Sequence, residues 1–61
     1  MALLFVDEDG SEGICLNNEY LERDNGEWTT YGYYDIVDLP AGTIESIIGY
    51  EITYEDNPVE I

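Results

Sequence analysis

A single arginine, Arg23, accompanies fifteen Asp and Glu residues in this chain of 61 residues, which has no Lys and no His. The formal net charge is -14, and like charges at this density repel one another and destabilise a compact state. A fold is still expected, because 44% of the residues are hydrophobic and 13% are aromatic, whereas disordered segments are poor in such side chains. The length allows one domain, residues 1–61, with a small core. We therefore expect one folded domain that salt stabilises.

The lack of cations also restricts the partners of the chain. Anionic lipid and nucleic acid should both repel it, so we expect no membrane binding and no direct DNA or RNA binding. The apolar residues 2–6 are too few for a signal peptide or a membrane span, and an acidic stretch follows them. Cys15 is the one cysteine, whereas secreted domains of this size usually carry several. These features predict a cytoplasmic protein.

The N-terminal third has the pattern of two strands joined by a turn. Residues 2–6 form an apolar run of strand length, which indicates a buried strand. Residues 7–13 are acidic and contain two glycines, as turns often do, and residues 14–16 can return as a second strand.

The next segment is ambiguous, because residues 19–24 fit either a helix or the first arm of a hairpin. The dipeptide Asn25-Gly26 favours the hairpin, since both central residues of a type I′ turn need positive φ. Residues 27–34 are rich in Trp, Thr and Tyr and are expected to form the second arm.

A short helix is predicted over residues 43–48. Isoleucines at positions 44, 47 and 48 have i, i+3, i+4 spacing, Thr43 is a candidate N-cap, and Gly49 is a candidate C-terminal stop. Residues 50–55 then alternate, with Tyr and Ile on one face and Glu and Thr on the other, which predicts a strand. The expected fold is α+β: a mostly antiparallel sheet of four or five strands with the helix packed on it.

The residue types needed for catalysis are missing. Without His or Lys, and with Cys15 lacking a base, the usual acid–base and nucleophilic sites cannot be assembled, so we predict no enzyme and a Cys15 that acts as a small buried hydrophobic residue. The acidic residues 7–12 invite comparison with a calcium loop, but glycine is fourth there and not sixth as in an EF-hand. We predict no catalytic, cofactor or metal site.

The charge itself is the remaining candidate for function. Duplex DNA carries one negative charge per roughly 1.7 Å of axis, so fourteen net charges match about 24 Å of duplex, close to the diameter of roughly 27 Å expected for a globule of this size. Carboxylates on alternate strand residues stand about 6.8 Å apart, which equals two phosphate steps of about 3.4 Å. Glu51 and Glu55, on one face of the predicted strand, could therefore follow a phosphate backbone. The tyrosines exceed what so small a core needs, and some are expected to face a partner. The predicted phosphate-mimicking residues are Glu22, Asp24, Glu27, Asp35, Asp38, Glu51, Glu55 and Asp56.

In size, acidity and lack of Lys, the whole chain resembles the DNA-mimic inhibitors that phages and mobile elements encode, including anti-CRISPR and anti-restriction proteins. The resemblance implies a protein that occupies the basic channel where a host DNA-binding protein or nuclease complex holds DNA. The inhibitor would then act in the cytoplasm of the host cell, as a monomer or a homodimer.

Two other interpretations fit the same composition. Proteins from a high-salt cytoplasm are acidic and poor in Lys, and such a domain should need molar salt to fold. A small acidic accessory or structural protein could instead bind a basic partner, and DNA would then not compete with it.

Overall fold

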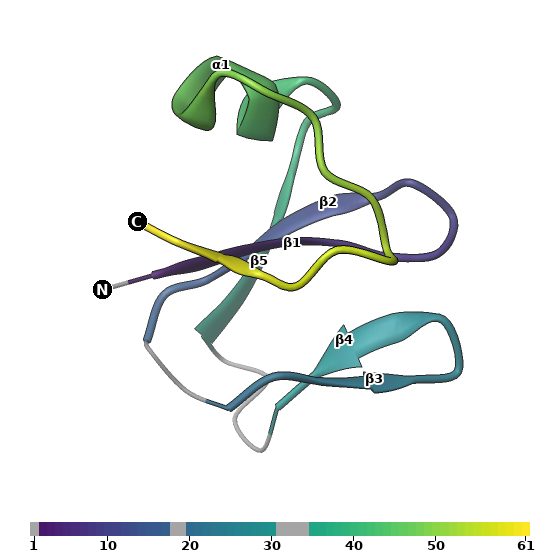
Figure 1. Ribbon diagram of the computed structural model, residues 1–61. Coiled ribbons are helices and arrows are strands. Elements are labelled where there is room, and N and C mark those ends of the chain that lie inside the picture. The colour runs from purple at the N-terminus through teal and green to yellow at the C-terminus, as the bar shows by residue number, and fades with distance from the viewer. Residues whose placement is uncertain (1, 18–19, 31–34) are drawn as a thin grey trace.

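The computed structural model describes residues 2–17, 20–30 and 35–61. Within them the chain forms a small α+β fold with one short helix and two antiparallel sheets, as Figure 1 shows, and this confirms the predicted fold class. The elements in chain order are β1 (Leu3–Val6), β2 (Glu12–Cys15), β3 (Glu22–Asp24), β4 (Glu27–Thr29), β5 (Ile36–Leu39), α1 (Thr43–Ile48) and β6 (Val59–Glu60).

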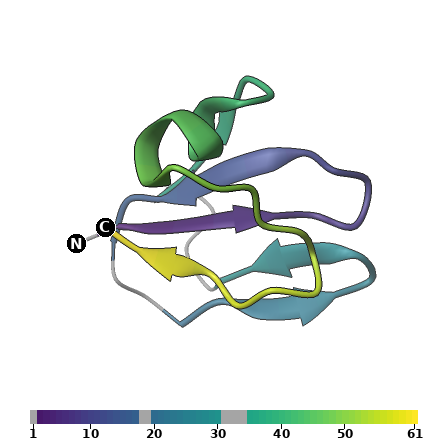
Figure 2. The ribbon, with the colours of Figure 1, turned by 45° about the horizontal axis from the view of Figure 1, so that its top comes forward.

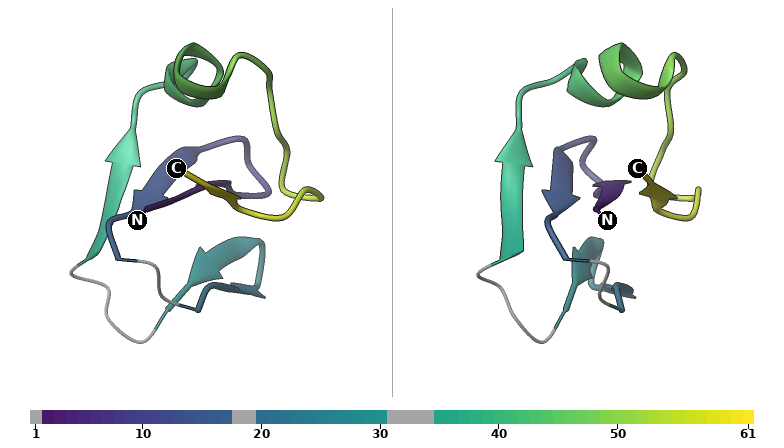
Figure 3. Two further views of the ribbon diagram at one scale, coloured as in Figure 1. Left: turned by 60° about the vertical axis from the view of Figure 1, so that its left-hand side comes forward. Right: turned by 90° about the vertical axis from the view of Figure 1, so that its left-hand side faces the viewer.

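The main sheet has four strands in the order β5-β2-β1-β6, and every pair is antiparallel. The hairpin β3-β4 forms a second sheet. Two further views show α1 on one side of the main sheet and the hairpin on the other (Figure 3). The two chain ends lie together at one end of the molecule, and the turns after β1 and β3 lie at the opposite end (Figure 2).

The apolar run of β1 supplies the core on both faces of the main sheet. Successive side chains of a strand point to opposite faces. Phe5 therefore packs with Cys15 and Trp28 beneath the hairpin, whereas Leu4 packs with Ile44 beneath the helix. Burial on two faces explains why this strand reads as a continuous hydrophobic segment and not as an alternating one.

The hairpin is present where the Asn-Gly dipeptide predicted it. Asn25 has φ 53° and Gly26 has φ 82°, the two positive values that a type I′ turn requires. The ambiguous segment contributes strand β3, and strand β4 is shorter than the predicted arm. The rest of that arm, residues 31–34, lies outside the described residues.

Helix α1 has the predicted bounds, but its N-terminus is capped differently. Gly42 and not Thr43 occupies the N-cap, and the Thr43 hydroxyl donates to the Pro40 carbonyl at 2.6 Å. The carboxylate of Glu12 in β2 accepts the amides of Gly42 at 2.6 Å and Ile44 at 2.8 Å. A side chain distant in sequence therefore satisfies amides that a helix leaves free at its start. Gly49, with φ 87°, ends the helix as predicted.

The predicted strand over residues 50–55 is wrong. The alternation is partly preserved, because Ile52 packs beneath the helix and Tyr54 packs against the hairpin cluster, but these residues join no sheet. The main chain instead turns after Thr53, whose amide donates to the Asp56 carboxylate at 2.8 Å. The Asp56 amide donates back to the Thr53 carbonyl at 3.0 Å. This local turn prevents a strand from continuing through residue 55.

Strands β5 and β6, which the pattern did not single out, form the two edges of the main sheet. Strand β6 pairs with β1, and reciprocal amide bonds between Ala2 and Ile61 extend the pairing at 3.2 and 2.9 Å. The sheet therefore reaches four strands without residues 50–55.

Candidate functional site: the acidic end

Three turns meet at the end of the molecule opposite the chain ends (Figures 1 and 2). The turn after β1 contacts the hairpin turn directly, because the Glu8 amide donates to the Gly26 carbonyl at 2.8 Å. The Trp28 amide donates to the Asp7 carboxylate at 2.9 Å. The third turn is residues 53–56. We call the carboxylates on these turns the acidic end: Asp7, Glu8, Asp9, Asp24, Glu27, Glu55 and Asp56.

Arg23 connects the hairpin to the third turn. Its Nε donates to the Tyr54 carbonyl and its Nη2 to the Glu55 carbonyl, each at 3.1 Å. A longer contact of 3.5 Å joins Nη2 to the Asp56 carbonyl. The guanidinium carbon also lies 4.5 Å from the centroid of the Trp28 ring and 5.4 Å from that of Tyr54. The one cationic side chain thus donates hydrogen bonds to main-chain carbonyls and stacks on rings, and within residues 2–17, 20–30 and 35–61 it donates none to a carboxylate.

Several carboxylates stabilise the turns themselves. Asp9 accepts the Ser11 amide at 2.9 Å, and this main-chain hydrogen bond is the largest cause that lowers the pKa of Asp9 from its ordinary value. Asp7 binds the Trp28 amide, and Asp56 binds the Thr53 amide. These three side chains are therefore held in place as part of the scaffold of the acidic end.

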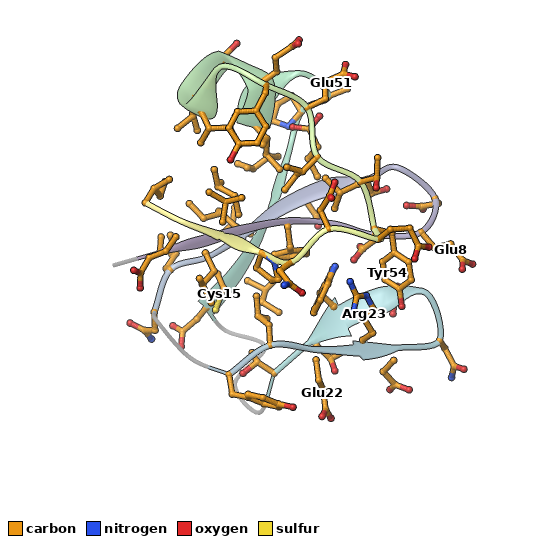
Figure 4. All side chains as sticks on the ribbon, viewed as in Figure 1. Glu8, Cys15, Glu22, Arg23, Glu51 and Tyr54 are labelled. Carbon is orange, nitrogen blue, oxygen red and sulfur yellow. The ribbon has the colours of Figure 1, made fainter. Side chains whose placement is uncertain are left out.

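The three acidic residues of the hairpin that were predicted to mimic phosphates lie on one of its faces. Asp24 and Glu27 are directly opposite in the β3-β4 register, so their side chains share a face, and Glu22 lies on the same face two residues earlier. Arg23 and Trp28 form the adjacent pair and face the other way. Figure 4 shows Arg23 pointing toward Tyr54 while Glu22 points away from the main sheet.

Two open hollows bring further acids beside the acidic end. One, of about 540 Å³, is bordered by Asp7, Asp9, Glu27 and Asp38. The other, of about 430 Å³, is bordered by acids from the first turn, β2, the helix and the segment after it, which are Asp7, Glu8, Glu12, Glu45 and Glu51. Asp38 and Glu51 therefore each border a hollow that residues of the acidic end also border. Glu51 itself lies beside α1 (Figure 4).

Asp35 lies away from the acidic end, and Glu22 and Glu51 project from opposite sides of the molecule (Figure 4). Asp35 precedes β5 at the end of the sheet where its carbonyl accepts the Leu16 amide, and its carboxylate accepts the side-chain amide of Asn17. Asp38 lies three residues along, opposite Gly13 and closer to the turn after β1. Asp35 is thus separated from the acidic end.

The sequence prediction omitted the acids of the first turn, Asp7, Glu8 and Asp9. Their run of three carboxylates beside a glycine indicated a solvated turn, and that is what they form. What makes them part of the site is the contact between this turn and the hairpin turn at Asn25-Gly26. That contact forms only in the tertiary fold, so no local sequence pattern indicates it.

The aromatic residues divide between the core and the surface. Tyr20 and Tyr50 are 71% and 53% exposed, whereas Tyr54 packs edge-on against Trp28 with ring centroids 6.0 Å apart. Tyr31, Tyr33 and Tyr34 lie outside the described residues. Among the tyrosines that the structure describes, Tyr20 and Tyr50 are the ones exposed enough for the expected partner contact.

Cys15 is fully buried, as predicted, and its Sγ donates to the Asn17 carbonyl at 3.2 Å. Across residues 2–17, 20–30 and 35–61, no three His, Cys, Asp or Glu side chains are grouped so as to hold a metal ion. In the same part of the chain, no helix has the length and apolar character needed to cross a membrane.

In comparisons with known proteins, no protein-family model, no curated protein and no solved structure matches the chain.

Proposed function

We propose that the protein is a non-enzymatic inhibitor that mimics double-stranded DNA. Its carboxylates would occupy the basic DNA-binding channel of a host defence protein, a CRISPR effector in the first place and a restriction enzyme in the second. The observation that supports this proposal is the acidic end, where three turns held together by hydrogen bonds carry seven carboxylates and the one arginine bonds to main-chain carbonyls.

The charge of the acidic end and the order of its turns both favour binding to a basic partner. A field of one sign steers a basic partner toward the surface and raises the association rate. Side chains on turns that are already ordered lose less conformational entropy when they bind. Asp7, Asp9 and Asp56 are ordered in this way by the amides that they accept.

The site proposed here differs from the one predicted along a strand. Residues 50–55 form no strand, so the match between strand spacing and phosphate spacing does not apply to Glu51 and Glu55. The proposed surface instead comprises the acidic end together with Glu22, Asp38 and Glu51, and Asp35 is left out.

Affinity capture from a bacterial lysate at low salt tests the proposal. The bound fraction is eluted with excess duplex DNA and identified by mass spectrometry. The expected result is a nuclease, restriction enzyme or CRISPR effector that DNA displaces. A captured partner that ignores DNA would contradict the proposal and favour an accessory protein, and an empty eluate would also contradict it.

Charge reversal locates the surface. Glu55→Lys and Glu51→Lys should each weaken capture of the target, because each places a cation against the basic channel. Glu60→Lys is the matched control, because this substitution makes the same change in net charge. Glu60 is exposed on β6, the strand beside the chain ends. Equal loss in all three variants would show that net charge alone governs binding and would exclude the acidic end as a specific surface.

A further inference from the structure

We infer that Arg23 is a positioning residue, which holds the main chain of residues 54–56 against the hairpin and thereby fixes Glu55 and Asp56 within the acidic end. The part of the inference that concerns binding rests on the proposed function. The part that concerns the free protein rests on the Arg23 contacts alone.

The contacts of Arg23 are suited to this role. Nε and Nη2 reach two successive carbonyls, those of Tyr54 and Glu55, from a strand more than thirty residues earlier in the chain. The guanidinium also stacks on Trp28, which is itself buried and anchored by the bond from its Nε1 to the Val6 carbonyl at 3.0 Å. The loop is therefore linked through Arg23 to the core of the protein.

The loop has little regular structure of its own. No residue from 50 to 58 belongs to a sheet, and the hydrogen bonds within the loop join Thr53 to Glu55 and Asp56. These local bonds shape the turn but do not attach it to the hairpin. Segments whose main chain lacks sheet or helix bonds open most readily, so loss of the Arg23 contacts should release this loop first.

A planar guanidinium is required for these contacts. Its donors point in fixed directions, so one group can bond to two carbonyls while its face stacks on a ring. A Lys ammonium carries the same charge as a compact point and cannot do both in this geometry. Arg23→Lys therefore separates the role of the contacts from the role of the charge.

Net charge and positioning predict opposite effects on binding. Replacing Arg23 by Gln changes the formal net charge from -14 to -15, because the one cation is lost. If net charge governed binding, a basic probe would bind the variant as tightly or more tightly. If Arg23 positions the loop, the complex should dissociate faster despite the added charge.

The first experiment uses the free protein. Amide hydrogen exchange is compared by NMR in wild type, Arg23→Gln, Arg23→Lys and Ser46→Glu, a control that also has a net charge of -15 and lies on an exposed position of α1. We expect the amides of Thr53 and Asp56 to exchange about tenfold faster in Arg23→Gln, with a smaller increase in Arg23→Lys. The β1 and β2 amides and the Ser46→Glu control should be unchanged. Unchanged exchange at Thr53 and Asp56 in both Arg23 variants would overturn the inference.

If Arg23→Gln fails to fold, amide hydrogen exchange in Arg23→Lys tests the inference instead. Faster exchange confined to the loop supports a positioning role. Equal acceleration across the main sheet would show that Arg23 contributes only to global stability, which also overturns the inference.

The second experiment measures binding kinetics to an immobilised oligo-arginine peptide. We expect Arg23→Gln to dissociate severalfold faster than wild type while associating at the same rate or faster. The association rate depends mainly on the net charge, whereas the dissociation rate depends on the contacts in the complex. Ser46→Glu should not dissociate faster. Slower or equal dissociation of Arg23→Gln would overturn the inference. A wild-type protein that does not bind the peptide would count against the proposed function, whereas the exchange result would still decide the role of Arg23.

Discussion

Glu12 shows that an acidic residue can stabilise this protein despite the excess of negative charge. Its two carboxylate oxygens accept the amides of Gly42 and Ile44 at the start of α1. Loss of a side-chain N-cap costs about 0.5–2 kcal/mol, and the negative charge also interacts favourably with the helix N-terminus. We predict that Glu12→Ala lowers the free energy of unfolding by about 1–2 kcal/mol in urea denaturation.

Glu60 provides the matched control for Glu12. It is exposed on β6 and accepts no hydrogen bond among the described side chains, so Glu60→Ala removes the same charge without removing a cap. Because the loss of one negative charge reduces repulsion, this variant should be as stable as wild type or slightly more stable. A loss of stability equal to that of Glu12→Ala would contradict the capping role.

At the level of elements, the attachment of the hairpin to the main sheet depends on Trp28. Its Nε1 donates to the Val6 carbonyl at 3.0 Å and its ring is buried with Phe5. Trp28→Phe removes the donor and part of the packing, so we predict a loss of about 1–3 kcal/mol in urea unfolding. Tyr50→Phe alters an exposed aromatic residue and should change stability little. Equal effects of the two variants would contradict the docking of the hairpin through Trp28.

The contact between the first turn and the hairpin can be tested by two glycines. Gly10 and Gly26 both have positive φ, at 90° and 82°, so an alanine at either position is strained by about 1–2 kcal/mol. A Cβ on Gly26 would also lie 3.2 Å from the Cβ of Glu8, whereas one on Gly10 meets open space. We predict that Gly26→Ala lowers the melting temperature more than Gly10→Ala. Equal losses would show that the two turns are not in firm contact.

The elements that the sequence predicted correctly are those that local signals specify. Asn25-Gly26 requires positive φ and therefore a hairpin, and Gly49 ends the helix for the same conformational reason. Strand β6 has two residues and is defined by pairing with β1, which local patterns do not encode. Residues 51–55 alternate in burial without pairing, so the pattern was informative about these side chains and misleading about their main chain.

The candidate site was partly predictable for a similar reason. The charge of Glu27, Asp38 and Glu51 is evident in the sequence, and each borders a hollow beside the acidic end. The roles of Arg23 and Glu12 were not predictable, because their partners lie about thirty residues away and become neighbours only in the fold. The resulting separation of Asp35 likewise follows from the length and direction of β5.

The whole molecule combines a small core with a charge of -14 on a body of 28 by 24 by 18 Å. At an ionic strength of about 0.01 M the screening length is about 30 Å, which exceeds the longest dimension, so each carboxylate repels every other one. At about 0.15 M the screening length falls to about 8 Å, and the repulsion is confined to neighbours such as those of the acidic end. Stability should therefore depend on salt over this range.

We predict that the melting temperature rises as sodium chloride increases from about 0.01 to 0.15 M, because screening weakens repulsion in the compact state more than in the expanded chain. For a domain of this size, each kcal/mol that screening restores raises the melting temperature by about 4–8 °C. Circular dichroism in sodium, potassium and tetramethylammonium chlorides checks the cause, since screening by monovalent salts gives equal curves. A flat response would mean that bound cations already neutralise the carboxylates, and a requirement for molar salt would favour adaptation to a saline cytoplasm over DNA mimicry.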